Sequence, residues 1–178
     1  MLIEKIQTLF RKRSLKKSAS TRPTGLCPIS RIRSAVTFID VEDTSFDVCK
    51  KAIQAFYRDN GIKGEIFFFD FRKIGDKERL ITSITNTILK KDLNWYGKPA
   101  KEKVDLLLQG EPDLFISLIN KDDFPIEFIA KTSTAHFRIG RRQLPGNTFD
   151  LVIKDPADKP YSEAEVFGEV VRFIDKIQ

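Results

Sequence analysis

The stretch DLFISLI at residues 113–119 decides the fold, because it is apolar at almost every position. Two other stretches have the same character, AVTFID at residues 35–40 and EIFFFD at residues 65–70. Unbroken apolar runs of this length are typical of strands that are covered on both faces, as in a parallel sheet. Helical patterns lie between the runs, which favours crossovers that join neighbouring parallel strands. We therefore expect a three-layer, Rossmann-like α/β fold.

Capping residues and helical periodicity predict the helices of this domain. Ser162 and Glu165 form the pattern of a capping box, and Asn60-Gly61 is a stop signal for the helix before it. The predicted helices cover residues 45–60, 100–109, 124–134 and the segment that begins at 163.

Shorter strands are predicted from brief apolar or alternating runs. These runs lie at residues 136–139, 149–153 and 81–89, and the last of them alternates in the manner of a half-exposed strand. Residues 94–97 predict a second strand beside residues 81–89. We therefore expect a mostly parallel sheet with an antiparallel insertion or edge.

Positive charge is concentrated at the start of the chain. The first 34 residues hold nine Lys/Arg and one acid, whereas the other 144 hold 22 basic and 24 acidic residues. This split predicts a basic amphipathic arm and linker over residues 1–30 and a single α/β domain over residues 31–178. No stretch approaches the ~20 apolar residues of a membrane-spanning helix, and no secretory signal is recognisable. The two cysteines are far apart in the sequence, so we expect a cytoplasmic protein.

The arm begins with an apolar pattern at helical spacing, formed by Leu2, Ile6, Leu9 and Phe10. Because Arg13 and Lys17 fall on this same face, we expect the amphipathic part to end near residue 12. Three partners remain open for the arm. Its apolar residues suit the body or a second subunit, and its bases suit either a nucleic acid or an anionic membrane.

Acidic residues follow the strands of the predicted sheet. Ligands of open α/β sheets bind beyond the carboxyl ends of the strands, where the strand order reverses. Carboxylate oxygens at this edge suit Mg²⁺. The candidates for metal binding are Asp40, Glu42, Asp70 and Asp123.

The segment DVEDT at residues 40–44 resembles the first motif of haloacid-dehalogenase-type phosphohydrolases, in which one Asp is the nucleophile and a second is the general acid. The resemblance implies an Mg²⁺-dependent phosphate-ester hydrolase that uses Asp40 with Asp122 or Asp123. Glu42 stands where that family has its second Asp. The alternative is that these acids cap helices and face solvent, since capping by itself demands such residues.

Three arginines, Arg138, Arg141 and Arg142, cluster at the end of a predicted strand and in the loop after it. Guanidinium groups hold anions and phosphates in bidentate geometry, which makes these residues candidates for anion binding. Surface ion pairs with the many acids of the body are the alternative.

Three segments, PDLFISL at residues 112–118, FPIEFIAKTS at 124–133 and AHFRIG at 135–140, resemble an uncharacterised bacterial family that is frequent in Bacteroidetes. That resemblance implies a bacterial, cytoplasmic α/β protein and transfers no catalytic residue. We therefore expect a binding or interaction module that needs no cofactor, with the Mg²⁺-dependent hydrolase as the alternative.

Overall fold

A sheet of six parallel strands forms the centre of the computed structural model, which describes residues 1–73 and 81–177. The strand order is β3-β2-β1-β4-β5-β6. The strands are β1 (Ser34–Asp40), β2 (Lys63–Asp70), β3 (Thr87–Leu89), β4 (Leu114–Ser117), β5 (Phe137–Gly140) and β6 (Leu151–Val152). The order reverses between β1 and β4, so the switch point lies between these two strands. The predicted α/β fold is confirmed, and its topology is consistent with a Rossmann-like fold.

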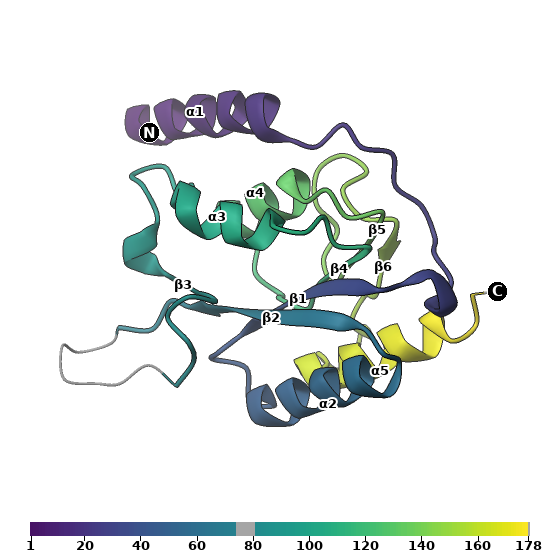
Figure 1. Cartoon of the computed structure of the whole chain (residues 1–178). Coiled ribbons are helices and arrows are strands. Elements are labelled where there is room, and N and C mark those ends of the chain that lie inside the picture. Colours follow the sequence, from purple (N-terminus) through teal and green to yellow (C-terminus); the bar gives the residue numbers. More distant parts are fainter. Residues whose placement is uncertain (74–80, 178) are drawn as a thin grey trace.

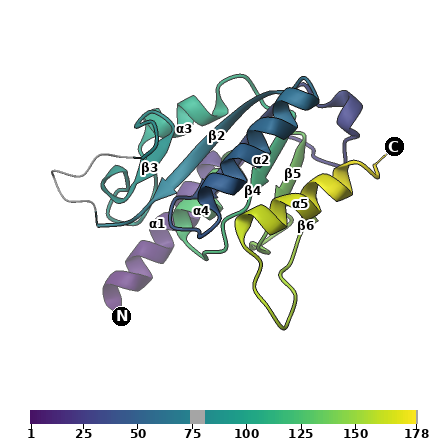
Figure 2. The ribbon, with the colours of Figure 1, turned by 90° about the horizontal axis from the view of Figure 1, so that it is seen from below.

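Helices cover both faces of the sheet (Figure 1). They are α1 (Leu2–Ser18), α2 (Phe46–Asp59), α3 (Lys101–Leu108), α4 (Phe124–Thr132) and α5 (Glu163–Ile174). Figure 2 shows α2 and α5 side by side across one face, and the two helices are in contact. The opposite face is covered by α3 and α4, and α1 packs outside that layer against α4.

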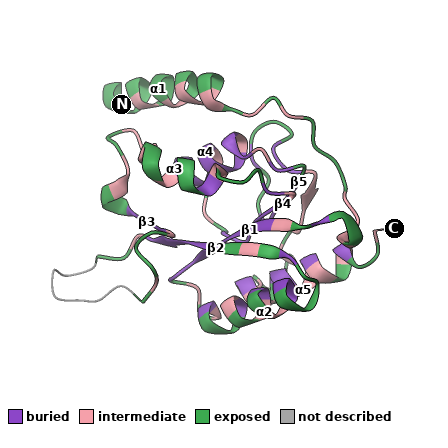
Figure 3. Ribbon diagram, in the orientation of Figure 1, coloured by how far each residue is buried: buried purple, intermediate pink, exposed green. Residues whose placement is uncertain are grey.

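Alternation along the strands divides the core into two clusters. In β1, Ala35 and Ile39 belong to the cluster under α2 and α5, whereas Val36 and Phe38 belong to the cluster under α3 and α4. This division follows from the two-residue period of a strand. Figure 3 shows buried residues in the central strands and on the inward sides of the helices. Burial on both faces explains why the central strands read as unbroken apolar runs.

The region after β2 differs from the expected antiparallel insertion. Of residues 81–89, only Thr87–Leu89 form a strand, and this strand pairs in parallel with β2. The antiparallel pairing is reduced to a single bridge between Leu93 and Pro99. The side chain of Asn94 accepts hydrogen bonds from the backbone N–H groups of Tyr96 and Lys98, and this closes a turn where we expected a strand.

The arm helix α1 continues to Ser18, beyond the amphipathic part that we expected to end near residue 12. Leu15 packs against the cluster of Phe124 and Phe128, and the Arg11 guanidinium lies 5.1 Å from the centre of the Phe124 ring. Contacts with the body thus support the second half of a helix that would be marginal by itself. Among the described helices, none combines the length and the apolar character required to cross a membrane.

The linker after α1 also lies on the body. The backbone N–H of Ser20 donates to the carbonyl of Lys131 at 2.8 Å, and the N–H of Gly25 donates to the carbonyl of His136 at 2.9 Å. These bonds place the arm and the linker along the α4 side of the sheet.

Candidate functional site

A cavity of about 450 Å³ opens at the carboxyl ends of β1 and β4, the switch point of the sheet. It is lined by the ends of these strands, by the loop after β5 and by the start of α5. The lining residues are Asp40, Glu42, Asp43, Asn120, Lys121, Arg141 and Glu163. Four of these residues carry carboxyl groups and two carry basic groups. Of the acids that the sequence suggested at this edge of the sheet, Asp40 and Glu42 are among the lining residues.

Asp40 is the last residue of β1 and lies at the centre of the cavity lining. Its side chain is only 9% exposed, and its Oδ1 accepts a hydrogen bond from the backbone N–H of Glu42 at 2.9 Å. Its Oδ2 lies 2.5 Å from the Nζ atom of Lys121. The loop geometry thus fixes the Asp40 carboxylate and aims one oxygen at the β4 side of the cavity.

Lys121 bridges two carboxylates at the carboxyl end of β1. Its Nζ lies 2.9 Å from Oε2 of Glu42 in addition to its contact with Asp40. Burial acts to lower the pKa of Lys121, but the hydrogen bonds to Asp40 and Glu42 outweigh it and raise that pKa. The Lys121 side chain is 38% exposed, so its ammonium group is positioned at the cavity mouth rather than locked inside.

Glu163, the first residue of α5, forms the buried floor of the cavity. Both of its carboxyl oxygens accept from the backbone N–H of Asp40, at 3.0 and 3.1 Å. Burial raises the pKa of Glu163 to about 9, and the nearby carboxylates of Asp43 and Asp40 act in the same direction. Glu163 therefore carries a proton at neutral pH.

Arg141 follows β5 and is fixed by protein groups. Its Nε and one terminal nitrogen donate to the two carboxylate oxygens of Asp155, each at 2.9 Å. The same guanidinium also donates to the carbonyl oxygens of Tyr161 and Leu118. Since only 4% of the Arg141 side chain is exposed, its charge is neutralised within the protein.

Side chains bind the first N–H groups of α5 beside the cavity. Asp43 accepts at Oδ1 from the N–H and the hydroxyl of Ser45, and at Oδ2 from the N–H of Glu163 at 3.3 Å. The hydroxyl oxygen of Ser45 accepts from the N–H of Ala164 at 3.0 Å. Free N–H groups at a helix start attract phosphate. Here these four residues use those groups within the protein.

Comparison with known protein families gives one match, a family of unknown function (DUF6913), over residues 4–167. The chain belongs to this family. The match begins inside α1 and ends inside α5, so it includes both the arm and the cavity. No curated protein and no solved structure matches the chain.

The other acids singled out in this DUF6913 protein lie outside the cavity lining. Asp70, at the end of β2, is bound through both carboxylate oxygens by Arg72, at 2.8 and 2.7 Å. The hydrogen bond from the Arg72 side chain lowers the pKa of Asp70 despite its burial. Asp122 lies 3.4 Å from the Arg142 guanidinium, and Asp123 occupies the position before α4.

The three arginines do not converge on one point. Arg141 is held by Asp155 and Arg142 faces Asp122, as described above. Arg138 lies within β5, where its Nε donates to the carbonyl of Ala135 at 3.3 Å. Burial lowers the pKa of Arg138. The pairs formed by Arg141 and Arg142 match the ion-pair alternative rather than a shared anion site.

The acids proposed to share Mg²⁺ do not fit one ion. Asp40 and Glu42 both face the Lys121 ammonium, while Asp70 faces Arg72. Within residues 1–73 and 81–177, no three His, Cys, Asp or Glu side chains gather as metal ligands would.

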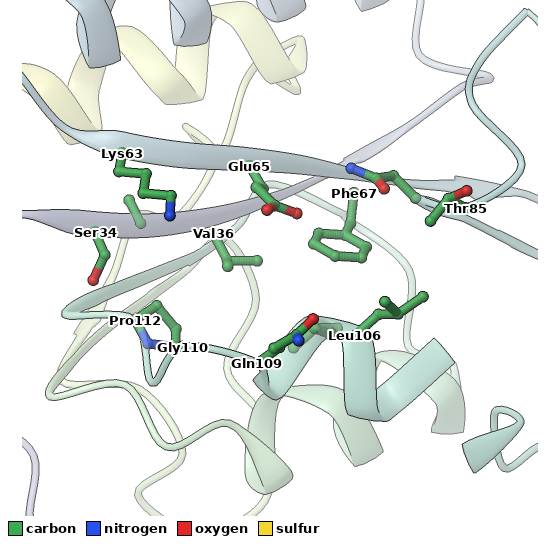
Figure 4. A pocket seen from close by; sticks show the side chains of 13 residues that line it. Ser34, Val36, Lys63, Glu65, Phe67, Thr85, Leu106, Gln109, Gly110 and Pro112 are labelled. Atoms are coloured by element: carbon green, nitrogen blue, oxygen red, sulfur yellow. The ribbon is translucent and has the colours of Figure 1, made fainter. Parts of the chain in front are cut away.

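A second cavity, of about 500 Å³, lies near the amino ends of β1 and β2, beside the end of α3. Figure 4 shows Lys63, Glu65 and Phe67 of β2 together with Val36 of β1 on the side that faces Leu106. The period of two places the three β2 side chains on one face, and α3 is too short to cover that face completely. This cavity lies away from the switch point, and the buried charged groups described above gather at the other edge.

Sequence reasoning missed two residues that line the switch-point cavity, Lys121 and Glu163, and also Asp155, which binds Arg141 of the lining. Lys121 is next to Asp122 and Asp123 in the sequence. Its position just after an apolar strand is the sequence feature that could have pointed to it. Glu163 was visible only as an acid in the first turn of a helix, which is ordinary capping chemistry. No local pattern distinguishes a buried acid of this kind from an exposed one.

Proposed function

We propose that this protein binds a small organic cation, with an ammonium or guanidinium group, in the switch-point cavity. It then acts as a binding module rather than as an enzyme. The observation that supports this is the position of the Lys121 ammonium between the carboxylates of Asp40 and Glu42, at 2.5 and 2.9 Å. A ligand ammonium in the same place would form the same two charged hydrogen bonds.

Lys121 can give up this position at small cost. Its side chain is 38% exposed and ends a flexible four-carbon stem, so its ammonium can move into water. A partly exposed ion pair of this kind contributes only about 0–1 kcal/mol to stability. Lys121 is therefore an internal competitor that leaves when the ligand arrives.

The charge of the cavity favours a cation over a phosphate. Asp40, Glu42 and Asp43 line the cavity, and Arg141 is already neutralised by Asp155. Clefts lined by one sign of charge concentrate ligands of the opposite sign. The side chains of Asp43 and Ser45 already bind the first two N–H groups of α5, so this helix start is not free to hold phosphate oxygens.

Binding should change the protonation of Glu163 little. The ligand ammonium takes the place of the Lys121 ammonium, so the number of positive charges in the cavity near this buried carboxyl group stays the same. The setting that we propose is the bacterial cytoplasm, in keeping with the composition and the family resemblance.

The test uses agmatine, which carries one guanidinium and one ammonium group, and follows the melting temperature of the full chain. Agmatine is expected to raise the Tm of the wild type and to leave that of Asp40→Asn unchanged. Lys121→Met removes the internal competitor, so we expect agmatine to bind roughly fivefold more tightly, which corresponds to about 1 kcal/mol. The matched control is Lys154→Met, which removes an exposed lysine outside the cavity lining.

Two further ligands make this test decisive. Inorganic pyrophosphate should leave the Tm unchanged, and tighter pyrophosphate binding by the wild type than by Lys121→Met would overturn the cation proposal. Mg²⁺ with p-nitrophenyl phosphate tests the hydrolase alternative. Turnover that requires Mg²⁺ and is lost in Asp40→Asn would replace the binding function with that activity.

A further inference from the structure

The outer face of α1 carries exposed apolar side chains, and it lies outside the switch-point cavity. Leu2, Ile6 and Leu9 are 74%, 40% and 66% exposed. Their spacing of four and three residues places them on one side of the helix. Ile3 extends the same side and is also exposed. Large apolar side chains gathered in this way mark an interaction surface.

The opposite side of α1 is already used by the body. The side chain of Gln7 donates to the carbonyl of Trp95 at 2.9 Å, and Nε of Arg11 donates to the carbonyl of Tyr96 at 2.7 Å. Leu15 continues this contact side toward α4. At 3.6 residues per turn, Gln7, Arg11 and Leu15 lie roughly half a turn away from the exposed apolar side chains. The body therefore holds α1 so that its apolar side points outward.

Basic residues surround the outward side. They are Lys5, Lys12, Arg13, Lys16 and Lys17, and all five are exposed. Arg13 follows Leu2, Ile6 and Leu9 on the same stripe, so the outer face is apolar in its first half and basic in its second half. Glu4, the one acid of α1, lies on the side of Gln7 and Arg11.

Aromatic side chains extend this face onto the body. Phe10 contacts Trp95 with ring centres 5.1 Å apart, and Trp95 is itself 56% exposed. Trp is enriched where protein meets the boundary between lipid and water, because its ring is apolar and its N–H is polar. Figure 1 shows that α1 forms the outermost layer above α3 and α4, so a flat surface can reach it.

We propose that the outer face of α1 binds the surface of an anionic phospholipid membrane. Leu2, Ile6 and Leu9 enter the acyl boundary, Trp95 lies at the headgroup level, and the five bases contact lipid phosphates. Apolar residues on one face with Lys/Arg beside them are the pattern of helices that lie in the membrane interface. Charge complementarity favours lipid over a second copy of this chain, because two copies would bring their bases together.

Vesicle co-sedimentation of the full chain tests the proposal. The wild type should bind vesicles that contain phosphatidylglycerol mixed with phosphatidylcholine, and should bind pure phosphatidylcholine far more weakly. High salt should reduce binding, since the attraction to anionic lipid is screened. Leu2→Gln with Ile6→Gln and Leu9→Gln should lower the partition coefficient at least tenfold. These positions are exposed, so this variant should keep the wild-type Tm.

A charge variant, which lacks four of the bases, measures the electrostatic contribution to vesicle binding. Replacement of Lys12, Arg13, Lys16 and Lys17 by Gln should lower the partition coefficient more than tenfold, given about 1 kcal/mol for each base near the surface. The matched control replaces four exposed lysines of the body by Gln and has the same net charge. Its substitutions are at Lys51, Lys63, Lys154 and Lys176. This control should bind anionic vesicles like the wild type.

Three results would overturn the membrane proposal. The first is equal binding of the wild type and the apolar variant to anionic vesicles. The second is tight binding of a short RNA that only the charge variant loses, which would assign the bases to nucleic acid. The third is a dimer of the wild type in light scattering that the apolar variant abolishes, which would assign the face to self-association.

Discussion

In the switch-point cavity, the buried Arg141 guanidinium binds the Asp155 carboxylate, whereas on the outer face of α1 five bases are exposed beside apolar side chains. The difference follows from burial. A buried charge is costly unless it is paired, while an exposed charge keeps its water. Substitution of the buried pair should therefore change stability. Substitutions on α1 should change binding and leave the body folded.

The largest expected effect comes from Arg141→Ala. It leaves the Asp155 carboxylate without the guanidinium that binds both of its oxygens, and we expect a loss of about 3 kcal/mol in the free energy of unfolding. Urea denaturation measures this loss. Arg142→Ala is the matched control, because Arg142 forms a longer, exposed pair with Asp122 and should cost less than about 1 kcal/mol. Equal losses in the two variants would remove the contrast between buried and exposed charge.

An intermediate effect is expected from Glu163→Gln, and it depends on pH. The folded protein keeps a proton on Glu163 up to about pH 9, whereas the unfolded chain releases it near 4.5. Wild-type stability that depends on this group is thus complete below pH 4.5 and is lost as pH rises toward 9. Gln keeps one acceptor oxygen for the N–H of Asp40 and does not titrate. The variant should gain more than about 1 kcal/mol relative to the wild type at pH 9.

Unfolding curves at pH 5 and pH 9 measure this difference. Glu169→Gln, at a partly exposed position of α5, serves as the control and should keep the wild-type dependence on pH. A Glu163→Gln variant whose stability falls with pH as steeply as that of the wild type would show that Glu163 is ionised in the fold.

The smallest effect is expected where α1 meets the body. Phe10→Ala removes the ring that contacts Trp95, so Trp95 becomes more exposed and its fluorescence emission shifts to longer wavelength. Trp95 is the only tryptophan of the chain, so the emission comes from this part of the molecule. Stability should fall by about 0.5–1.5 kcal/mol, the contribution of an aromatic pair. Leu9→Ala should leave both the emission and the stability as they are, because Leu9 faces outward.

The central strands were predictable because a strand that is buried on both faces is composed mostly of apolar residues. Residues of β1 that face α2 and α5 and residues that face α3 and α4 are both apolar, so a continuous run such as 35–39 has no other simple explanation. The short strand β3 was mispredicted at residues 81–86 because alternation over a few positions also occurs in turns. There, the hydroxyl of Thr87 and the N–H of Asn86 both donate to the carbonyl of Ser83, which closes a turn.

The candidate site was predictable only in part. Asp40, Glu42 and Asp43 could be placed at a carboxyl edge, because each follows an apolar strand within a few residues. Their partners could not, since Lys121 and Glu163 come from segments about 80 and 120 residues further along the chain. Side-chain pairing over such separations depends on which strands are neighbours.

The sequence by itself determined the parallel α/β architecture, the basic character of the first 34 residues and the acids that follow β1. These features depend on composition and on the pattern of neighbouring residues, so they can be predicted from the order of residues along the chain. The tertiary structure alone decided that Lys121 lies between Asp40 and Glu42, that Glu163 is buried, and which side of α1 faces outward. Burial and charge pairing are properties of surfaces that come together only when the chain has folded.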